Sequence, residues 1–230
     1  MKALLIYSGG MDSTTLLHDF KDSIELAISF DYGSKHNDHE YGYAVKNTQH
    51  LGIKHERVDL KPVMGMFKSS LLKTGEAIPE GHYAEDNMKS TVVPFRNGIM
   101  LSIAAGIAES NDLDTILIAN HFGDFAQYPD CRDKFIENMN AAIEEGTDNK
   151  VKLHAPYTLI TKRDIAVKGK EIGIDFANTW SCYKAEGDKH CGKCGTCVER
   201  VWALKGFDTT EYEDKEFAVE ELKKSGEWDD

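Results

Sequence analysis

The chain has 230 residues, of which 41% are hydrophobic and 29% are charged, which fits a soluble protein with one well-buried domain. Its apolar runs are far shorter than the ~20 residues that cross a bilayer, and its start does not resemble a signal peptide, so we expect a cytoplasmic protein with no membrane partner. The formal net charge of −12, from 39 acidic against 27 basic residues, argues against a direct nucleic-acid partner, because proteins that bind phosphate backbones present basic surfaces.

Apolar segments alternate along the chain with segments of helical character. Strands are predicted over residues 3–7, 24–30, 54–60, 115–119 and 151–154. Helices are predicted over residues 14–21, 41–51, 96–110, 131–145 and 161–171. Residues 61–91 are polar and rich in glycine, which predicts a long loop or lid with short helices. The alternation predicts an α/β fold with a parallel five-stranded sheet, covered by helices on both faces in a Rossmann-like arrangement.

No internal repeat or linker divides the chain. We therefore expect one catalytic domain over residues 1–206, which includes a cysteine-rich segment over residues 178–200. Residues 207–230 are expected to form an acidic helix or tail, because residues 208–230 hold ten acidic side chains against three lysines.

The first predicted strand is followed by the run Ser8-Gly9-Gly10-Met11-Asp12-Ser13-Thr14. In parallel sheets ligands bind at the carboxyl ends of the strands. Glycines let the backbone turn its N–H groups inward, and the hydroxyls and the helix N-terminus add further attraction for an anion. These features predict a pyrophosphate site, where Asp12 would need Mg²⁺ to lie beside the phosphates. A Ser-Gly-Gly turn that merely caps a helix remains the alternative.

Four cysteines follow the pattern C-x8-C-x2-C-x2-C, formed by Cys182, Cys191, Cys194 and Cys197. This ligand set and spacing predict a structural Zn²⁺ site, with Gly192 and Gly195 permitting the tight turns. An iron–sulfur cluster is the main alternative. We expect His190 to be exposed rather than a ligand, and Cys131 to be buried and inert rather than a nucleophile.

The run Ser-Gly-Gly-x-Asp-Ser after the first strand resembles the pyrophosphate loop of the N-type ATP pyrophosphatases, a superfamily of the adenine nucleotide α-hydrolase type that cleaves ATP to AMP and pyrophosphate. Other motifs narrow the resemblance to the QueC family, and it covers about residues 3–205. These motifs are Phe30-Asp31-Tyr32-Gly33, Val93-Pro94-Phe95-Arg96-Asn97, Tyr128-Pro129-Asp130-Cys131-Arg132, Thr179-Trp180-Ser181-Cys182-Tyr183 and the last three cysteines with Arg200.

The resemblance implies an ATP-dependent C–N ligase and nitrile synthase. QueC enzymes convert 7-carboxy-7-deazaguanine and ammonia to 7-cyano-7-deazaguanine, through acyl-adenylate and amide intermediates, in queuosine and related deazapurine biosynthesis. The expected partners are therefore these small molecules and ATP with Mg²⁺, and the expected assembly is a homodimer.

The resemblance also implies roles for individual residues. Asp12, Ser13 and Lys162 are expected at the catalytic centre, although Lys162 could equally be a solvent-exposed lysine at a helix start. ATP is expected to contact Ser8, Gly9, Gly10, Met11, Asp12, Ser13, Thr14, Phe30, Asp31 and Tyr32. The candidate substrate-binding residues are Arg96, Asn97, Asp124, Tyr128, Asp130 and Arg132, whose alternative role is to brace turns.

Two segments depart from the family pattern. The chain has Ala126-Gln127 where the family carries Ser-Gly, and Ser34-Lys35-His36 where it carries Gln-Arg-His. These changes concern the substrate rather than the adenylation chemistry. Rival functions are a tRNA thiolase, a defence protein that conjugates a deazaguanine, and a non-catalytic nucleotide sensor. The acidic composition argues against the first, and the retained loop hydroxyls and Asp12 argue against the last.

Overall fold

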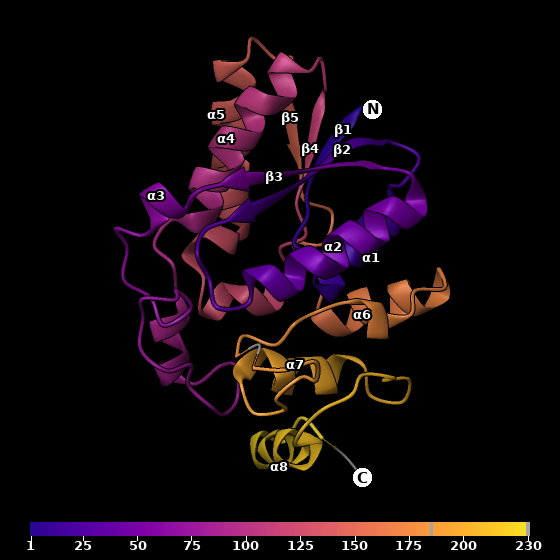
Figure 1. The fold of residues 1–230 in the computed structure, drawn as a ribbon. Coiled ribbons are helices and arrows are strands. Elements are labelled where there is room, and N and C mark those ends of the chain that lie inside the picture. The colour runs from indigo at the N-terminus through magenta and orange to yellow at the C-terminus, as the bar shows by residue number, and fades with distance from the viewer. Residues whose placement is uncertain (185, 229–230) are drawn as a thin grey trace.

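A parallel five-stranded sheet forms the centre of the computed structural model (Figure 1), as the alternation of segments predicts. The strand order is β3-β2-β1-β4-β5, with bounds Lys54–Asp59, Ile24–Asp31, Ala3–Ile6, Thr115–Leu117 and Lys152–His154. The structure describes residues 1–184 and 186–228. Residue 185 in the cysteine-rich segment, and residues 229 and 230 of the predicted acidic tail, lie outside the described residues.

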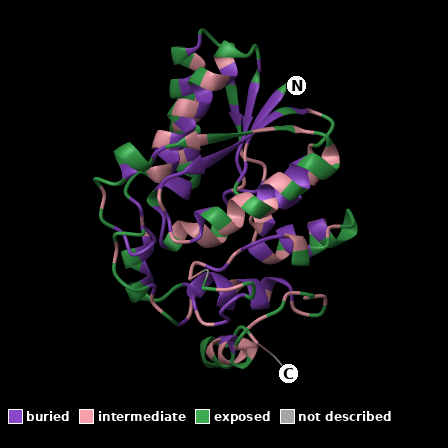
Figure 2. Ribbon diagram, viewed as in Figure 1, coloured by how far each residue is buried: buried purple, intermediate pink, exposed green. Residues whose placement is uncertain are grey.

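Helices cover both faces of this sheet. On one face, β1 and β2 pack through Ala3, Leu5 and Ala27 against α1 (Met11–Asp19), α2 (Asn37–Leu51) and α6 (Lys162–Glu171). On the other face, Leu4 and Ile28 pack against α4 (Arg96–Ser110) and α5 (Asp133–Gly146). Figure 2 shows β1, β2 and β4 largely buried between these layers, whereas the edge strands β3 and β5 carry exposed positions.

Some element boundaries differ from the prediction. Helix α1 begins at Met11 rather than residue 14, because Gly10 is its N-cap and accepts the N–H of Thr14 at 2.9 Å. Asp12 and Ser13 therefore lie in the first helical turn. Helix α5 begins only at Asp133, after the short 3-10 helix η3 (Pro129–Cys131). A second 3-10 helix, η2 (Phe122–Ala126), follows β4.

The segment over residues 61–91 contains two short helices, α3 (Lys61–Met64) and η1 (Asp86–Thr91). Met64, Leu71 and Met88 in this segment are buried. The segment also meets the cysteine-rich region, where the N–H of Gly81 donates to the carbonyl of Lys193 at 3.0 Å.

The C-terminal part of the chain forms two helices beyond the sheet (Figure 1), α7 (Gly195–Ala203) and α8 (Lys215–Ser225). The short 3-10 helix η4 (Phe176–Asn178) precedes them. Ala218 and Leu222 of α8 pack on Val198 and Val201 of α7. The predicted C-terminal helix is therefore present in the described residues, and its apolar face is buried.

An 18-residue window within Asp86–Ser110 has the length and hydropathy of a membrane span, with a mean hydropathy of 1.3. However, 50% of it is buried inside the fold, and its main helix, α4, packs against β1 and β4. The hydropathy of this window is therefore explained by the place of α4 in the core of the fold.

Candidate active site

A cavity of about 230 Å³ lies at the carboxyl ends of β1, β2 and β4. The strand order reverses at this point, because β2 and β3 are added on one side of β1 and β4 and β5 on the other. Ligands usually bind at such a position in these folds. The candidate residues that line the cavity are Ser8, Gly10, Met11, Asp12, Ser13, Phe30, Tyr32, Arg96, Asn97, Asp124, Tyr128 and Lys162. The candidates that do not line it are Gly9, Thr14, Asp31, Asp130 and Arg132.

The turn between β1 and α1 forms one wall of the cavity. The hydroxyls of Ser8 and Ser13 lie 3.0 Å apart, and the Ser8 hydroxyl accepts the Gly10 N–H at 3.1 Å. The first N–H groups of a helix lack partners within the helix, and the helix dipole attracts anions to that end. The turn can therefore hold the phosphates of a nucleotide.

Gly9 allows this turn to pack tightly on α2. Its φ is +91°, and a Cβ at this position would lie 2.3 Å from the carbonyl oxygen of Glu40. We expect Gly9→Ala to lower the free energy of unfolding by about 2–3 kcal/mol in urea unfolding, through backbone strain and overpacking. Gly42→Ala is the control, because that position on α2 has open space around it and should be neutral or slightly stabilising. Unchanged stability of Gly9→Ala would contradict the packing of the turn on α2.

Two predicted ATP contacts, Thr14 and Asp31, do not line the cavity and bond to neighbouring residues instead. The Thr14 hydroxyl lies 3.1 Å from the Tyr7 hydroxyl. Asp31 Oδ2 accepts from Arg57 at 2.7 Å and from Lys61 at 2.8 Å. Burial raises the pKa of Asp31, but the Lys61 hydrogen bond and the Arg57 charge outweigh it, so the net pKa is lowered. Asp31 therefore joins β2 to β3 and α3 as a carboxylate.

Lys162 lies in the wall of the cavity and is only 7% exposed. Its Nζ lies 2.9 Å from Asp12 Oδ2, 3.0 Å from Glu199 Oε2 and 3.2 Å from His121 Nε2. Burial lowers the pKa of Lys162, but the charges of Asp12 and Glu199 outweigh it and raise the pKa. The side chain is therefore a buried cation, and the alternative of a solvent-exposed lysine at a helix start is wrong.

Asp12 retains one oxygen for a ligand. Its Oδ1 is buried and has no hydrogen-bond partner among the described residues. Mg²⁺ prefers oxygen ligands and usually binds a carboxylate together with substrate phosphates. The position of Asp12 beside the phosphate-binding turn fits such an ion.

The start of α4 is held by η3. Asp130 Oδ2 accepts the backbone N–H of Asn97 at 2.8 Å, and the Asn97 amide donates to Cys131 Sγ at 3.1 Å. A carboxylate at the N-terminus of a helix satisfies a free N–H group and complements the dipole. Burial raises the pKa of Cys131 well above its usual value, which agrees with an inert thiol. Asp130 thus positions the backbone that carries Arg96.

Arg96 enters the cavity among tyrosines. Its Nη1 donates to the Tyr32 hydroxyl at 3.0 Å. The guanidinium carbon lies 5.4 Å from the Tyr32 ring centre and 6.0 Å from that of Tyr128. The Tyr128 hydroxyl is 3.4 Å from that of Tyr183, which also lines the cavity. These rings give this part of the cavity an aromatic lining with polar hydroxyl groups.

Glu40 and His36 complete this part of the cavity. Burial raises the pKa of Glu40 to about 8, although the charge of Arg96 opposes the shift. Burial and the charge of Arg96 lower the pKa of His36 to about 3. Near pH 7 both side chains are therefore predominantly neutral, and Arg96 is the charged group among them.

The departure at Gln127 affects the segment over residues 61–91 rather than the cavity wall. The Gln127 amide donates to the carbonyls of Tyr83 and Glu85 at 3.3 and 3.2 Å. The Tyr83 hydroxyl in turn donates to Asp124 Oδ1 at 3.1 Å. Gln127 thus secures a segment whose Tyr83 lines the cavity.

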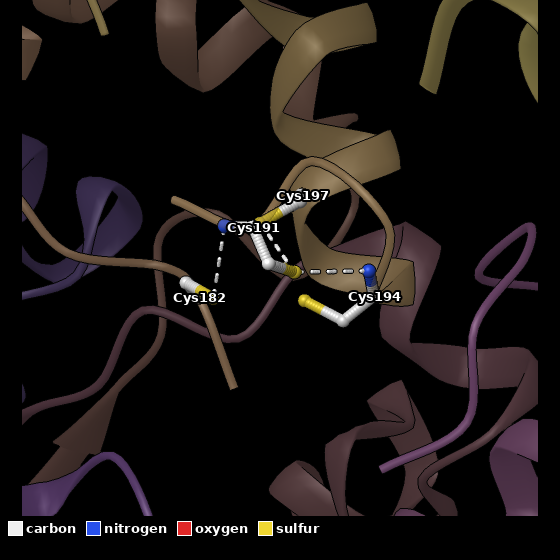
Figure 3. Close-up of side chains that lie close together, drawn as sticks. All are labelled: Cys182, Cys191, Cys194 and Cys197. Atoms are coloured by element: carbon white, nitrogen blue, oxygen red, sulfur yellow. Dashed lines mark hydrogen bonds between the residues drawn. The ribbon is translucent and has the colours of Figure 1, made fainter. Parts of the chain in front are cut away.

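The four cysteines come together beside α7, and Figure 3 shows their sulfur atoms close to one another. All four Sγ atoms lie within 4.8 Å of each other, and those of Cys191 and Cys197 are 3.9 Å apart. Ligands at about 2.3 Å around a tetrahedral Zn²⁺ would be roughly 3.8 Å apart. The N–H groups of Lys193 and Cys194 both donate to Cys191 Sγ at 3.3 Å, which suits a thiolate ligand. The cluster can therefore hold a metal ion.

Two residues beside the cluster, Gly195 and His190, differ from the expectation. Gly192 has the expected positive φ, +77°. Gly195 instead begins α7, and a Cβ there would lie 3.2 Å from the Cα of Tyr83, so this glycine allows a close approach of two segments. His190 is buried rather than exposed, and its Nε2 accepts the N–H of Ser181 at 3.0 Å.

Helix α7 connects the cysteine cluster to the cavity. Cys194 is its N-cap, and Cys197 lies in its first turn. Thr196 lines the cavity, and Glu199 forms the ion pair with Lys162. Arg200 is fully buried and donates to the Ser181 hydroxyl at 2.9 Å.

Sequence reasoning missed several residues of the site. Those that line the cavity include Glu40, Tyr41, Arg57, Tyr83, Asn120 and Thr196. His121 and Glu199 were also missed, although both contact Lys162. Asn120 and His121 follow the predicted fourth strand, so the rule that ligands bind at the carboxyl ends of strands could have found them. Glu199 carries no such signal, because α7 lies outside the sheet.

Comparison with known proteins gives consistent results. A family model described as "Queuosine biosynthesis protein QueC" matches residues 2–208. A "7-cyano-7-deazaguanine synthase" of Porphyromonas gingivalis is 57% identical over 214 residues, which cover 92% of this chain and 97% of the relative. Proteins with the same name from Desulfotalea psychrophila and Methanoregula boonei are 48% and 47% identical. The alignments with these two cover 91% and 93% of this chain and 98% and 100% of the relatives.

Proposed function

Because the chain belongs to the QueC family of queuosine biosynthesis proteins, we propose that its cavity converts 7-carboxy-7-deazaguanine to 7-cyano-7-deazaguanine. The protein is an enzyme of this family, and its curated relatives carry the name 7-cyano-7-deazaguanine synthase. ATP adenylates the substrate carboxylate and releases pyrophosphate, and ammonia then displaces AMP to give the amide. A second ATP adenylates the amide oxygen with release of pyrophosphate and one proton, and loss of AMP and the second proton leaves the nitrile.

One observation supports this proposal most strongly. The phosphate-binding turn and Lys162 line the same cavity as Arg96 and its tyrosines. ATP and a planar acid can therefore bind side by side, as an adenylation reaction requires.

The residues act mainly through charge and position. Ser8, Gly10 and Ser13 hold the phosphates, and Lys162 stabilises the negative charge that gathers on departing pyrophosphate. Asp12 and Glu199 hold the Lys162 ammonium in place. Bound Mg²⁺, with Asp12 as its protein ligand, would supply further positive charge to the same phosphates. Phe30, near the end of β2, is proposed to contact the adenosine, whereas Tyr32 contacts Arg96.

The four-cysteine cluster is proposed to bind Zn²⁺ as a structural ion. Four thiolates fill a tetrahedral shell and leave no position for water or substrate. The ion would hold α7, which delivers Thr196 and Glu199 to the cavity.

We also propose that the enzyme acts in the cytoplasm as a homodimer and binds small molecules rather than nucleic acid. The net charge of −12 supports the last point, because a nucleic-acid surface would be basic.

Purified enzyme with Mg-ATP, ammonium and 7-carboxy-7-deazaguanine is expected to form the nitrile with AMP and pyrophosphate, as measured by mass spectrometry. Accumulation of the amide alone would leave adenylation in place but contradict the second cycle. A conjugate of the deazaguanine with another molecule would favour the defence-protein alternative. No use of ATP by a metal-loaded, folded sample would refute the proposal.

A further inference from the structure

Arg96 is a cation in the cavity that lacks an anionic partner. Among the described residues its guanidinium makes one hydrogen bond, to the Tyr32 hydroxyl, and no ion pair. A guanidinium has five N–H donors, so most of them remain available. A partly buried arginine is usually paired, because an unpaired charge away from water is unfavourable. The missing partner is therefore expected to be an anion that enters the cavity.

The surroundings of Arg96 point to the kind of anion. Tyr32, Tyr128 and Tyr183 line the cavity around the guanidinium, and aromatic side chains of this kind suit a planar heterocycle. The guanidinium is itself planar and matches a carboxylate with two parallel hydrogen bonds. A planar ring that carries a carboxylate satisfies both features together.

The position of Arg96 is also fixed by contacts that exist before a ligand binds. Asp130 holds the N–H of Asn97, the next residue of α4, and the Tyr32 hydroxyl holds the guanidinium. A donor that is positioned before the ligand binds loses little conformational freedom on binding. This preorganisation favours a recognition role over that of a mobile surface charge.

We propose that Arg96 binds the carboxylate of 7-carboxy-7-deazaguanine and selects the acid over the amide intermediate. This inference rests on the proposed function, and it distinguishes the first adenylation from the second. The acid carries a negative charge on its carboxylate oxygens, whereas the amide is neutral. Arg96 is therefore required for the first adenylation and contributes much less to the second, which starts from the amide.

The test compares both substrates in the same variant, so the amide is the matched control for folding and ATP binding. Arg96→Gln is expected to lower kcat/KM for the acid on the order of 100-fold, as for loss of one partner of a desolvated charge pair. For the synthetic amide, kcat/KM should change by less than about threefold, since no charge pair is lost there. Arg96→Lys keeps the charge but not the two-pronged geometry, so it should recover only part of the acid activity.

Tyr32→Phe supplies a second variant that keeps the ring but frees the guanidinium. It should weaken the acid reaction modestly and selectively. If Arg96→Gln lowers both reactions equally, Arg96 serves the nucleotide or the fold, and the inference is overturned while the proposed function stands. Unchanged activity with the acid would overturn it as well. If wild-type enzyme converts neither substrate, the proposed function itself fails and the inference fails with it.

Discussion

Lys162→Met is expected to reduce kcat/KM for the acid by about 1,000-fold, the upper range for loss of a single preorganised charge-stabilising group. The ammonium is the cation nearest to Asp12 at the phosphate-binding turn, with 2.9 Å between Nζ and Oδ2. Its loss removes stabilisation of the departing pyrophosphate. Steady-state kinetics that follow pyrophosphate release would measure the effect.

Stability must be separated from catalysis in this variant. Removal of Lys162 leaves Asp12 and Glu199 without their partner, and breaking a buried pair costs about 3–5 kcal/mol. Urea unfolding therefore accompanies the kinetics. Lys168→Met, on the exposed part of the same helix, is the matched control, because its ion pair with Asp19 is at the surface. A rate for Lys162→Met within about twofold of wild type would limit Lys162 to a structural role.

Loss of the metal is expected to have the largest effect on stability. Structural zinc contributes roughly 10 kcal/mol to the folding of small zinc domains, so Cys194→Ser should lower the free energy of unfolding by more than about 4 kcal/mol. Trp180 is buried next to the cluster and donates to the carbonyl of Cys182 at 2.8 Å. Its fluorescence, with metal content by mass spectrometry and urea unfolding, would report the change.

Cys131→Ser is the control for metal content. Cys131 is buried on the cavity wall and lies outside the four-cysteine cluster, so this variant should retain its metal. Full metal content or unchanged stability in Cys194→Ser would show that the cluster does not stabilise the chain through an ion. Excess zinc added to metal-free wild type should restore the Trp180 signal.

The sequence by itself determined the sheet and both motifs. Strands buried on both faces are largely apolar, as residues 3–6 and 26–28 are, and this pattern is local enough to recognise directly in the sequence. The four cysteines can be recognised as candidate metal ligands equally directly, because metal ligation imposes short spacings along the chain. The phosphate-binding turn follows from glycines and hydroxyls placed immediately after a strand.

Only the tertiary structure decided which candidates share the cavity. Asp31 is predicted to contact ATP, yet its side chain bonds to Arg57 and Lys61, because strand β3 and helix α3 bring those partners close. Glu199 reaches Lys162 from a helix that lies outside the sheet. Such contacts join positions far apart in the chain and depend on how the layers pack, so no local periodicity or spacing encodes them.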